Sequence, residues 1–326
     1  MDHKLEIRST IEKAQKIAIF WHRNPDGDCV WSLLWLGKLL KKQGKDISFF
    51  TPTSVTDRYG FVGDISVIKT EFDYGAYDLL LFLDFSDISR IYEFWNGHEE
   101  YFTKYPIVVI DHHISKTPDP TRLRESDPHA MSACEVIFEL VYPWWPELFD
   151  KEIATCFYLW LVTDSGNLTY DEDHERILKN SLKLIQLGAN KKLIINNVIR
   201  NKSFKTVKMM ERLFARLQQK GDFVYSRYTG DDISDLNVSE DDADAGQIVI
   251  QDIAEAKATC IFREQNGSFH GSLRSKAFDV EHIARSFGGG WHLYAAWFRT
   301  DRVWDFETQL EQISTQIAEM VSKTKD

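Results

Sequence analysis

The chain has 326 residues, of which 43% are hydrophobic, and its formal net charge at pH 7 is -11. This length allows two domains with separate cores, and the negative charge argues against a protein that coats long nucleic acid by neutralising its phosphates. No apolar run approaches the roughly 18 residues that a membrane span needs, and the charged N-terminus and four widely spaced cysteines favour a reduced, cytoplasmic protein without a signal peptide.

Strand-like and helix-like patterns alternate along the first half of the chain. The N-terminal pattern predicts a helix over Leu5–Ala14. The predicted strands are Lys16–Phe20, Asp46–Thr51, Leu79–Leu83 and Ile107–Ile110. The predicted helices that follow are Val30–Lys42, Ser132–Tyr142, Glu152–Val162 and His174–Leu187. Strands separated by helices indicate an α/β domain with a mainly parallel sheet flanked by helices.

The second half of the chain predicts a linker and a smaller α/β domain with a mixed sheet. Residues from about 191 to 221 have helical periodicity and many basic side chains, and we interpret them as a linking helix between domains at 1–190 and 222–326. The acidic stretch Asp231–Asp244 reads as a solvated loop and helix cap. The predicted strands are Phe223–Tyr228, Ala258–Arg263 and Phe269–Leu273, before a helix at Val280–Phe287.

Acids and histidines follow apolar runs at four places in the first half. Taken alone, each group has a structural explanation, such as a surface turn, a strand end or a helix-terminating turn. Their joint occurrence favours function, because the carboxyl ends of parallel strands meet at the ligand-binding edge of an open α/β sheet. Aspartate and histidine without cysteine favour Mn²⁺-like ions, and two such ions can clamp a phosphoryl displacement. The donors are His22, Asp26, Asp28, Asp84, Asp111, His112, His113 and Asp164.

The four segments resemble the motifs of the DHH phosphoesterase family, named for the tripeptide seen here at Asp111–His113. The second half resembles the DHH-associated domain through Ser272-Leu-Arg-Ser-Lys276, Asp279-Val280, Ile283-Ala284, Phe287-Gly-Gly-Gly-Trp-His292 and Ala295-Ala296. The pairing is most similar to the branch of bifunctional oligoribonucleases (nanoRNases) and 3′-phosphoadenosine 5′-phosphate (pAp) phosphatases.

The resemblance implies a role for each donor. One metal ion would bind His22, Asp26 and Asp84, and the second would bind Asp28, Asp84, His112 and Asp164, so that Asp84 bridges the two. His113 would contact the scissile phosphate or protonate the leaving oxygen, and Asp111 would orient an imidazole.

The resemblance also implies a substrate site in the C-terminal domain, which would close over the metal centre. Arg274 would clamp a phosphate with its forked guanidinium, and Ser275, Gly288, Gly289, Gly290 and His292 would complete a nest for the distal nucleotide. Without the resemblance, Arg274 would be read as an exposed strand residue and the glycines as a flexible turn.

The expected activity is hydrolysis of short oligoribonucleotides, of linear dinucleotides such as pApA, and of pAp, by a hydroxide that two divalent ions activate. Mn²⁺ is the expected metal, with Mg²⁺ or Co²⁺ as alternatives, and a homodimer is compatible with the sequence. One alternative is an inorganic pyro- or polyphosphatase. The other is a catalytically silent nucleotide-binding protein.

The chain departs from the family pattern by having Trp31, Trp160, Trp291 and Trp297 where glycine is usual. Typical usage of about 7% would give about 23 glycines, whereas the chain has 17 glycines and 10 tryptophans. We hypothesise that the source organism reads the codon UGA as glycine, and that the sequence was translated with UGA as tryptophan. Trp21 and Trp35 could belong to the same set of misread codons, whereas Trp144 and Trp145 could be genuine tryptophans. The alternative is real aromatic substitution that obstructs the site.

Overall fold

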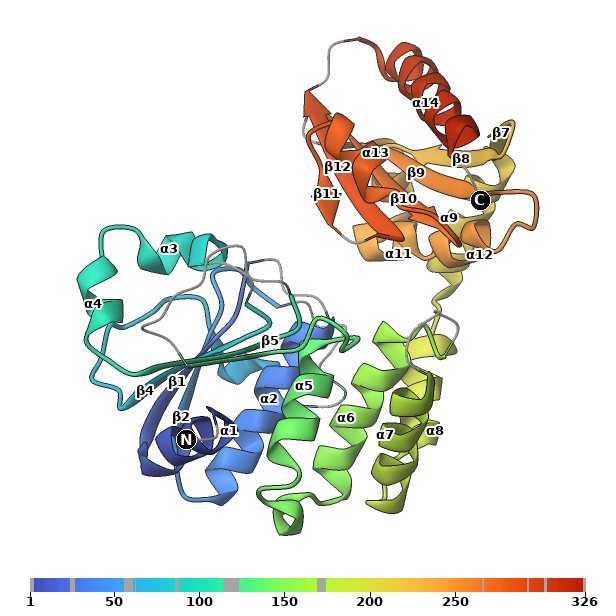
Figure 1. Ribbon diagram of the computed structural model, residues 1–326. Helices are drawn as coiled ribbons and strands as arrows, with labels where there is room; N and C mark the ends of the chain where they lie inside the picture. Colours follow the sequence, from blue (N-terminus) through green and yellow to red (C-terminus); the bar gives the residue numbers. More distant parts are fainter. Residues whose placement is uncertain are drawn as a thin grey trace. The chain divides into compact units, whose positions relative to one another are not determined.

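The computed structural model describes residues 3–23, 27–55, 61, 63–85, 88–113, 123–168, 174–265, 267–291, 293–301 and 304–324. The chain divides into two compact units, Met1–Asn201 and Lys202–Asp326, called unit 1 and unit 2 below. Figure 1 colours unit 1 from blue to yellow-green and unit 2 from yellow to red.

Unit 1 is built on a six-stranded sheet in the order β3-β2-β1-β4-β5-β6, in which every pair of neighbours is parallel. The strands are β1 (Lys16–Phe20), β2 (Asp46–Phe50), β3 (Ile68–Lys69), β4 (Leu79–Leu83), β5 (Ile107–Asp111) and β6 (Leu123–Ser126). From β1 the chain adds strands on one side, and from β4 it adds them on the other. The carboxyl ends of β1 and β4 therefore flank the topological switch point, where open α/β sheets bind ligands.

Helices cover both faces of this sheet (Figure 1). Alternate strand residues such as Ile17 and Leu81 pack under α2, α5 and α6, whereas Phe20 and Phe82 face the side covered by α3 and α4. Both faces are apolar, as expected of a buried parallel sheet. The helices are α1 (His3–Lys13), α2 (Gly27–Lys42), α3 (Tyr92–Trp95), α4 (Glu99–Thr103), α5 (Ala133–Val141), α6 (Lys151–Asp164), α7 (His174–Gln186) and α8 (Lys191–Ile194).

The fold class and the long elements of unit 1 are as the sequence predicts, but two edge strands are additional. β3 has only two residues, and β6 reads Leu-Arg-Glu-Ser with all four side chains half-buried. Neither segment has an apolar run or an alternating pattern, so their pairing depends on neighbours that are distant in sequence.

The stretch expected as one linking helix is interrupted. α8 continues into a π-helical turn at Ile195–Ile199, and α9 begins at Phe204 after a break. The side chain of Ser203 accepts a hydrogen bond from the backbone N–H of Thr206 and so caps a new helix. The boundary between the two units, at Asn201 and Lys202, lies in this break.

Unit 2 contains a mixed six-stranded sheet in the order β11-β12-β10-β9-β8-β7, in which only β8 and β9 are parallel. Its strands are β7 (Gln218–Lys220), β8 (Phe223–Tyr228), β9 (Ala258–Gln265), β10 (Ser268–Ser275), β11 (Gly290–Trp291) and β12 (Ala295–Asp301). Its helices are α9 (Phe204–Ala215), α10 (Gly230–Leu236), α11 (Glu240–Asp244), α12 (Gln247–Gln251), α13 (Glu281–Ser286) and α14 (Phe306–Lys323). Of the helices described in both units, none combines the length and the apolar character required to cross a membrane.

The acidic stretch of unit 2 supplies helix caps, as the sequence predicts, but it is not a solvated loop, which corrects that half of the interpretation. Residues 230–236 and 240–244 form α10 and α11, and Asp232 is buried. Its carboxylate accepts hydrogen bonds from Arg212 at 2.9 Å and from Arg216 at 2.5 and 2.9 Å. It also accepts one from the backbone N–H of Thr229, which completes a capping box. Asp232 is therefore stabilised by two arginines at the C-terminal end of α9, Arg212 within the helix and Arg216 as its C-cap.

This arrangement predicts a pH dependence of stability. Burial raises the pKa of Asp232, but the bonds from Arg216, Thr229 and Arg212 outweigh it and lower the pKa to about 2. Because the unfolded value is about 4, the ionised carboxylate stabilises unit 2 above that pH, and the contribution falls as the pH drops towards 2. We expect Asp232→Asn to lose roughly 2 kcal/mol at pH 7. Urea unfolding of both proteins between pH 2 and 7 measures this; a difference that does not shrink at low pH would contradict it.

Candidate metal centre

Four predicted site residues meet at the carboxyl edge of the unit 1 sheet. His22 follows β1, Asp84 follows β4, and His112 and His113 follow Asp111, the last residue of β5. These three strands are adjacent, so parallel pairing alone brings their ends together. Asp84 adopts a left-handed backbone conformation with φ of 53°, which is uncommon for a residue other than glycine. Such strain is concentrated at functional sites.

The carboxylate of Asp84 lies at the centre of this cluster. Asp84 is 3% exposed and His22 is 4% exposed. Asp84 Oδ2 lies 3.1 Å from Nε2 of His22, and Oδ1 lies 3.6 Å from Nε2 of His112 and 3.4 Å from Nδ1 of His113. Oδ1 is buried and has no hydrogen-bond partner among the described residues. Asp84, His112 and His113 each offer a ligand atom, all within 4.8 Å of one another, so this trio could hold a metal ion.

The hydrogen bonds of the imidazoles show why a cation fits here. Nδ1 of His22 lies 2.7 Å from the carbonyl of Arg23, and Nδ1 of His112 lies 3.2 Å from the carbonyl of Ala130. Since a carbonyl only accepts, each Nδ1 must carry the proton. The other ring nitrogen, Nε2, faces an oxygen of Asp84, to which it donates a proton when the ring is charged, whereas a neutral ring offers a lone pair there to a cation. A cation on each side of the carboxylate would satisfy both contacts.

The electrostatic surroundings keep Asp84 ionised. Burial opposes the charge, but the hydrogen bond and charge of His22, with the charges of His112 and His113, hold the pKa of Asp84 well below its usual range. An ionised carboxylate is the form that coordinates a divalent ion.

Asp111 connects the histidines to a half-buried arginine, Arg124. Its Oδ1 accepts hydrogen bonds from Nδ1 of His113 and the backbone N–H of His112, both at 2.8 Å. Its Oδ2 accepts one from Nη1 of Arg124 at 2.9 Å. Burial works against both charges of the Asp111–His113 pair, but their hydrogen bond lowers the pKa of Asp111 and raises the pKa of His113. The other guanidinium nitrogen of Arg124 donates to the carbonyl of Phe85 at 2.8 Å, beside Asp84.

A second buried acid fixes the loop that holds His112. Glu135 is 1% exposed, and its Oε2 accepts the backbone N–H of Met131 at 3.0 Å. Its Oε1 accepts a hydrogen bond from Asn180 of α7 at 2.9 Å. Because burial raises the pKa of Glu135, these donors are important for keeping its charge. The carbonyl of Ala130 is thereby held against His112.

Two arginines of this site carry no clear signal in the sequence. Arg124 lies on the polar edge strand β6. Arg90 lies on a short 3₁₀ turn, and its Nη1 is buried without a hydrogen-bond partner in the described part of the chain. The charge of Arg90 acts on the pKa of His113, opposing protonation. A buried, positively charged donor beside the histidines suits a phosphate oxygen.

The predicted substrate residues of unit 2 lie around the end of β10. Arg274 is half-buried on β10, where its Nη1 donates to the carbonyl of Leu273 at 2.8 Å. Oγ of Ser275 accepts the backbone N–H groups of Ala277 and Phe278, so it stabilises the turn after β10. Gly288 has φ of +79°, and a Cβ on Gly289 would lie 2.0 Å from the carbonyl oxygen of Trp297. The local backbone therefore requires glycine at both positions.

Four of the other predicted site residues lie partly or wholly outside the described part of the chain. Asp26 and His292 are not among the described residues. Asp28 is in the first turn of α2 and Asp164 is the last residue of α6, but the described part of the chain does not include their side chains. Gly290 begins β11.

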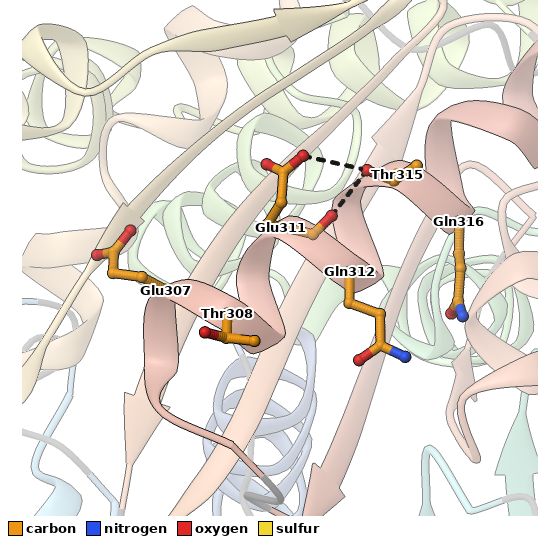
Figure 2. Close-up of a pocket in the computed structure, with 6 residues that line it drawn as sticks. All are labelled: Glu307, Thr308, Glu311, Gln312, Thr315 and Gln316. Carbon is orange, nitrogen blue, oxygen red and sulfur yellow. Dashed lines mark hydrogen bonds between the residues drawn. The ribbon is translucent and has the colours of Figure 1, made fainter.

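A hollow elsewhere on unit 2 does not resemble a phosphate site. Figure 2 shows that its lining side chains project from one helix, α14. Oγ1 of Thr315 donates to the carbonyl of Glu311, and the two oxygens are 2.8 Å apart. The lining residues are Glu307, Thr308, Glu311, Gln312, Thr315 and Gln316. Glu307 is paired with Arg227 and Glu311 with Lys220, and no lining residue is cationic, so this surface offers no positive group to a phosphate.

Comparison with known proteins gives matches over both halves of the chain. Residues 16–159 match the DHH family, N-terminal domain. The chain is similar to the bifunctional oligoribonuclease and PAP phosphatase NrnA of Mycoplasma genitalium, with 24% identity over 321 residues that cover 98% of this chain and 96% of the relative. It is also similar to the protein of the same name from Bacillus subtilis (strain 168), with 24% identity over 319 residues, 94% of this chain and 98% of the relative.

Solved structures share the fold. An exopolyphosphatase-related protein from Bacteroides fragilis has a TM-score of 0.86 at 23% identity, with 98% of both chains covered. Exonuclease RecJ bound to manganese has a TM-score of 0.50 at 14% identity, covering 100% of this chain and 94% of the other. The match to the DHH family, N-terminal domain, includes the Asp111–His113 tripeptide at the end of β5, and with the similarity to the NrnA proteins it supports the assignment of the chain as a phosphoesterase.

Proposed function

We propose that this phosphoesterase hydrolyses short oligoribonucleotides, linear dinucleotides such as pApA, and 3′-phosphoadenosine 5′-phosphate, using two divalent metal ions. The observation that carries the proposal is the buried carboxylate of Asp84, with the Nε2 atom of a histidine beside each of its oxygens. The near full-length similarity to proteins named oligoribonuclease and PAP phosphatase supports the choice of substrates.

Each residue of unit 1 then has a defined task. The divalent ions, with Mn²⁺ proposed ahead of Mg²⁺ and Co²⁺, would supply an activated water and neutralise charge on the phosphate. His22, Asp26 and Asp84 would hold one ion, and Asp84, His112, Asp28 and Asp164 the other. His113, held by Asp111, would contact the scissile phosphate or protonate the leaving oxygen. Arg90 would bind a phosphate oxygen that gains negative charge during the reaction.

Unit 2 would recognise the rest of the substrate. We propose residues 1–190 as the catalytic domain and 222–326 as the DHH-associated domain, in which Arg274 clamps a phosphate. Ser275, Gly288, Gly289, Gly290 and His292 would shape the nest around the distal nucleotide. A substrate of a few nucleotides is consistent with the formal net charge of -11, because only local cations are needed to bind a short anion.

The test is turnover of the purified chain on pApA, pAp, a five-nucleotide RNA and inorganic pyrophosphate. We expect Mn²⁺-dependent release of mononucleotide from pApA and the RNA, and of phosphate from pAp. Chelation should remove the activity and added Mn²⁺ should restore it, because the donors of the site are hard oxygen and nitrogen atoms. Turnover of pyrophosphate alone would favour a pyrophosphatase, and nucleotide binding without turnover would favour a silent binding protein.

A further inference from the structure

Three tryptophans in the core of unit 1 leave their indole N–H groups unsatisfied. Trp21, Trp35 and Trp160 are each 0% exposed, and Nε1 of each has no hydrogen-bond partner among the described residues. Native cores pair nearly all buried donors, because an unpaired one carries its full desolvation penalty. Trp145 lies in the same core at 6% exposure without leaving a buried, unpaired Nε1.

Trp35 is also crowded by its neighbour across a helix–helix contact. Its ring centroid lies 3.6 Å from that of Phe157, with the planes tilted by 43°. Aromatic pairs in proteins usually have centroids about 4.5–7 Å apart. Trp35 belongs to α2, whereas Phe157 and Trp160 belong to α6. The two helices therefore lie too close together for an indole between them, and overpacking of this kind destabilises a core.

Each of the three positions lies close in sequence to a candidate metal ligand. Residue 21 precedes His22, residue 35 follows Asp28 by seven positions in α2, and residue 160 precedes Asp164 by four positions in α6. Seven and four residues correspond to about two turns and one turn of helix. A residue without a side chain at each position would let β1, α2 and α6 approach closely behind the site.

We propose that positions 21, 35 and 160 are glycine in the natural protein, encoded by UGA codons that its own cell decodes as glycine. The close approach of α2 and α6 that these glycines permit then sets the spacing of the backbone at positions 22, 28 and 164. The positioning role rests on the proposed function, whereas the identity of the three residues does not.

The first test is to read codons 21, 35 and 160 in the source gene, with codon 145 as the control. The second compares thermal unfolding of the full chain, without metal, between the printed sequence and a Trp21→Gly, Trp35→Gly, Trp160→Gly variant. Glycine is unfavourable inside a helix, so any gain must come from removing the unpaired donors and the crowded contact. The matched control, Trp145→Gly, should lower the unfolding temperature by on the order of 10 °C.

Two results together would establish the proposal. The codons at 21, 35 and 160 should be TGA, with TGG at 145, and the triple variant should unfold at a higher temperature than the printed sequence. TGG at the three positions would overturn it. A triple variant that loses stability as Trp145→Gly does would also overturn it, because the indoles would then be packed parts of the core. Neither measurement depends on turnover, so failure here is distinguishable from failure of the proposed enzymatic function.

Discussion

We expect the Asp84→Asn variant to lose catalysis while it keeps its fold. The asparagine would present an oxygen to one imidazole and an NH₂ group to the other, and the NH₂ would donate to an Nε2 lone pair in place of a cation. Loss of the shared carboxylate should lower kcat on pApA with Mn²⁺ by roughly 10³-fold or more. The unfolding temperature without metal should fall, because the lowered pKa of Asp84 means that the folded state favours its charged form, but the chain should stay folded at the assay temperature.

The matched control is Asp46→Asn, which changes the same residue type at the opposite, amino-terminal edge of the sheet. Asp46 is exposed and begins β2. We expect the kcat of the Asp46→Asn variant, and its affinity for Mn²⁺ measured by calorimetry, to equal those of the unchanged chain. Turnover that survives in Asp84→Asn would refute the bridging role of this carboxylate.

The second large effect is expected at Arg124, which positions the catalytic edge without reaching a metal ligand directly. Arg124→Met keeps much of the apolar stem but leaves Asp111, 0% exposed, with His113 as its remaining charged partner. Breaking a fully buried ion pair on one side costs about 3–5 kcal/mol, and we expect a smaller loss here because Arg124 is only half-buried. Because Arg124 also bonds to the carbonyl of Phe85, kcat should fall by roughly 10–100-fold as His113 and Asp84 lose their supports.

Two comparisons separate this role from a general loss of charge. Arg8→Met removes an exposed arginine that pairs with Glu12 one helical turn away, and it should cost at most about 0.5 kcal/mol. The double variant Arg124→Met, Asp111→Asn should recover part of the lost stability, measured by urea unfolding, but not the lost kcat. If the Arg124→Met variant were as stable as the unchanged chain, the ion pair between Arg124 and Asp111 would not stabilise this edge of the sheet.

The sequence predicts the sheet of unit 1 and its ligand-binding edge because both depend on local patterns. β1, β4 and β5 are continuous apolar runs, and the donors that follow them must converge once the strands pair in parallel. The sequence could therefore place His22, Asp84, His112 and His113 together without knowledge of any distance.

Features that depend on tertiary pairing could not be predicted in this way. Arg124 pairs with Val109 in the register of β5 and β6, and nothing within its own strand indicates that its side chain reaches Asp111. The acidic residues around Asp232 resemble a solvated loop until α9 brings Arg212 and Arg216 against them. In both cases a polar residue is buried because its partner comes from elsewhere in the chain, which local composition does not record.

The strained backbone of Asp84 has a consequence for how long the protein persists. The left-handed backbone of Asp84 and its buried Oδ1, which has no hydrogen-bond partner among the described residues, each carry a free-energy cost when no cation is bound. A cation that binds only the native state would offset this destabilisation by mass action. The supply of divalent metal in the cell would then set the fraction of molecules that open transiently, and so the rate at which proteases remove them.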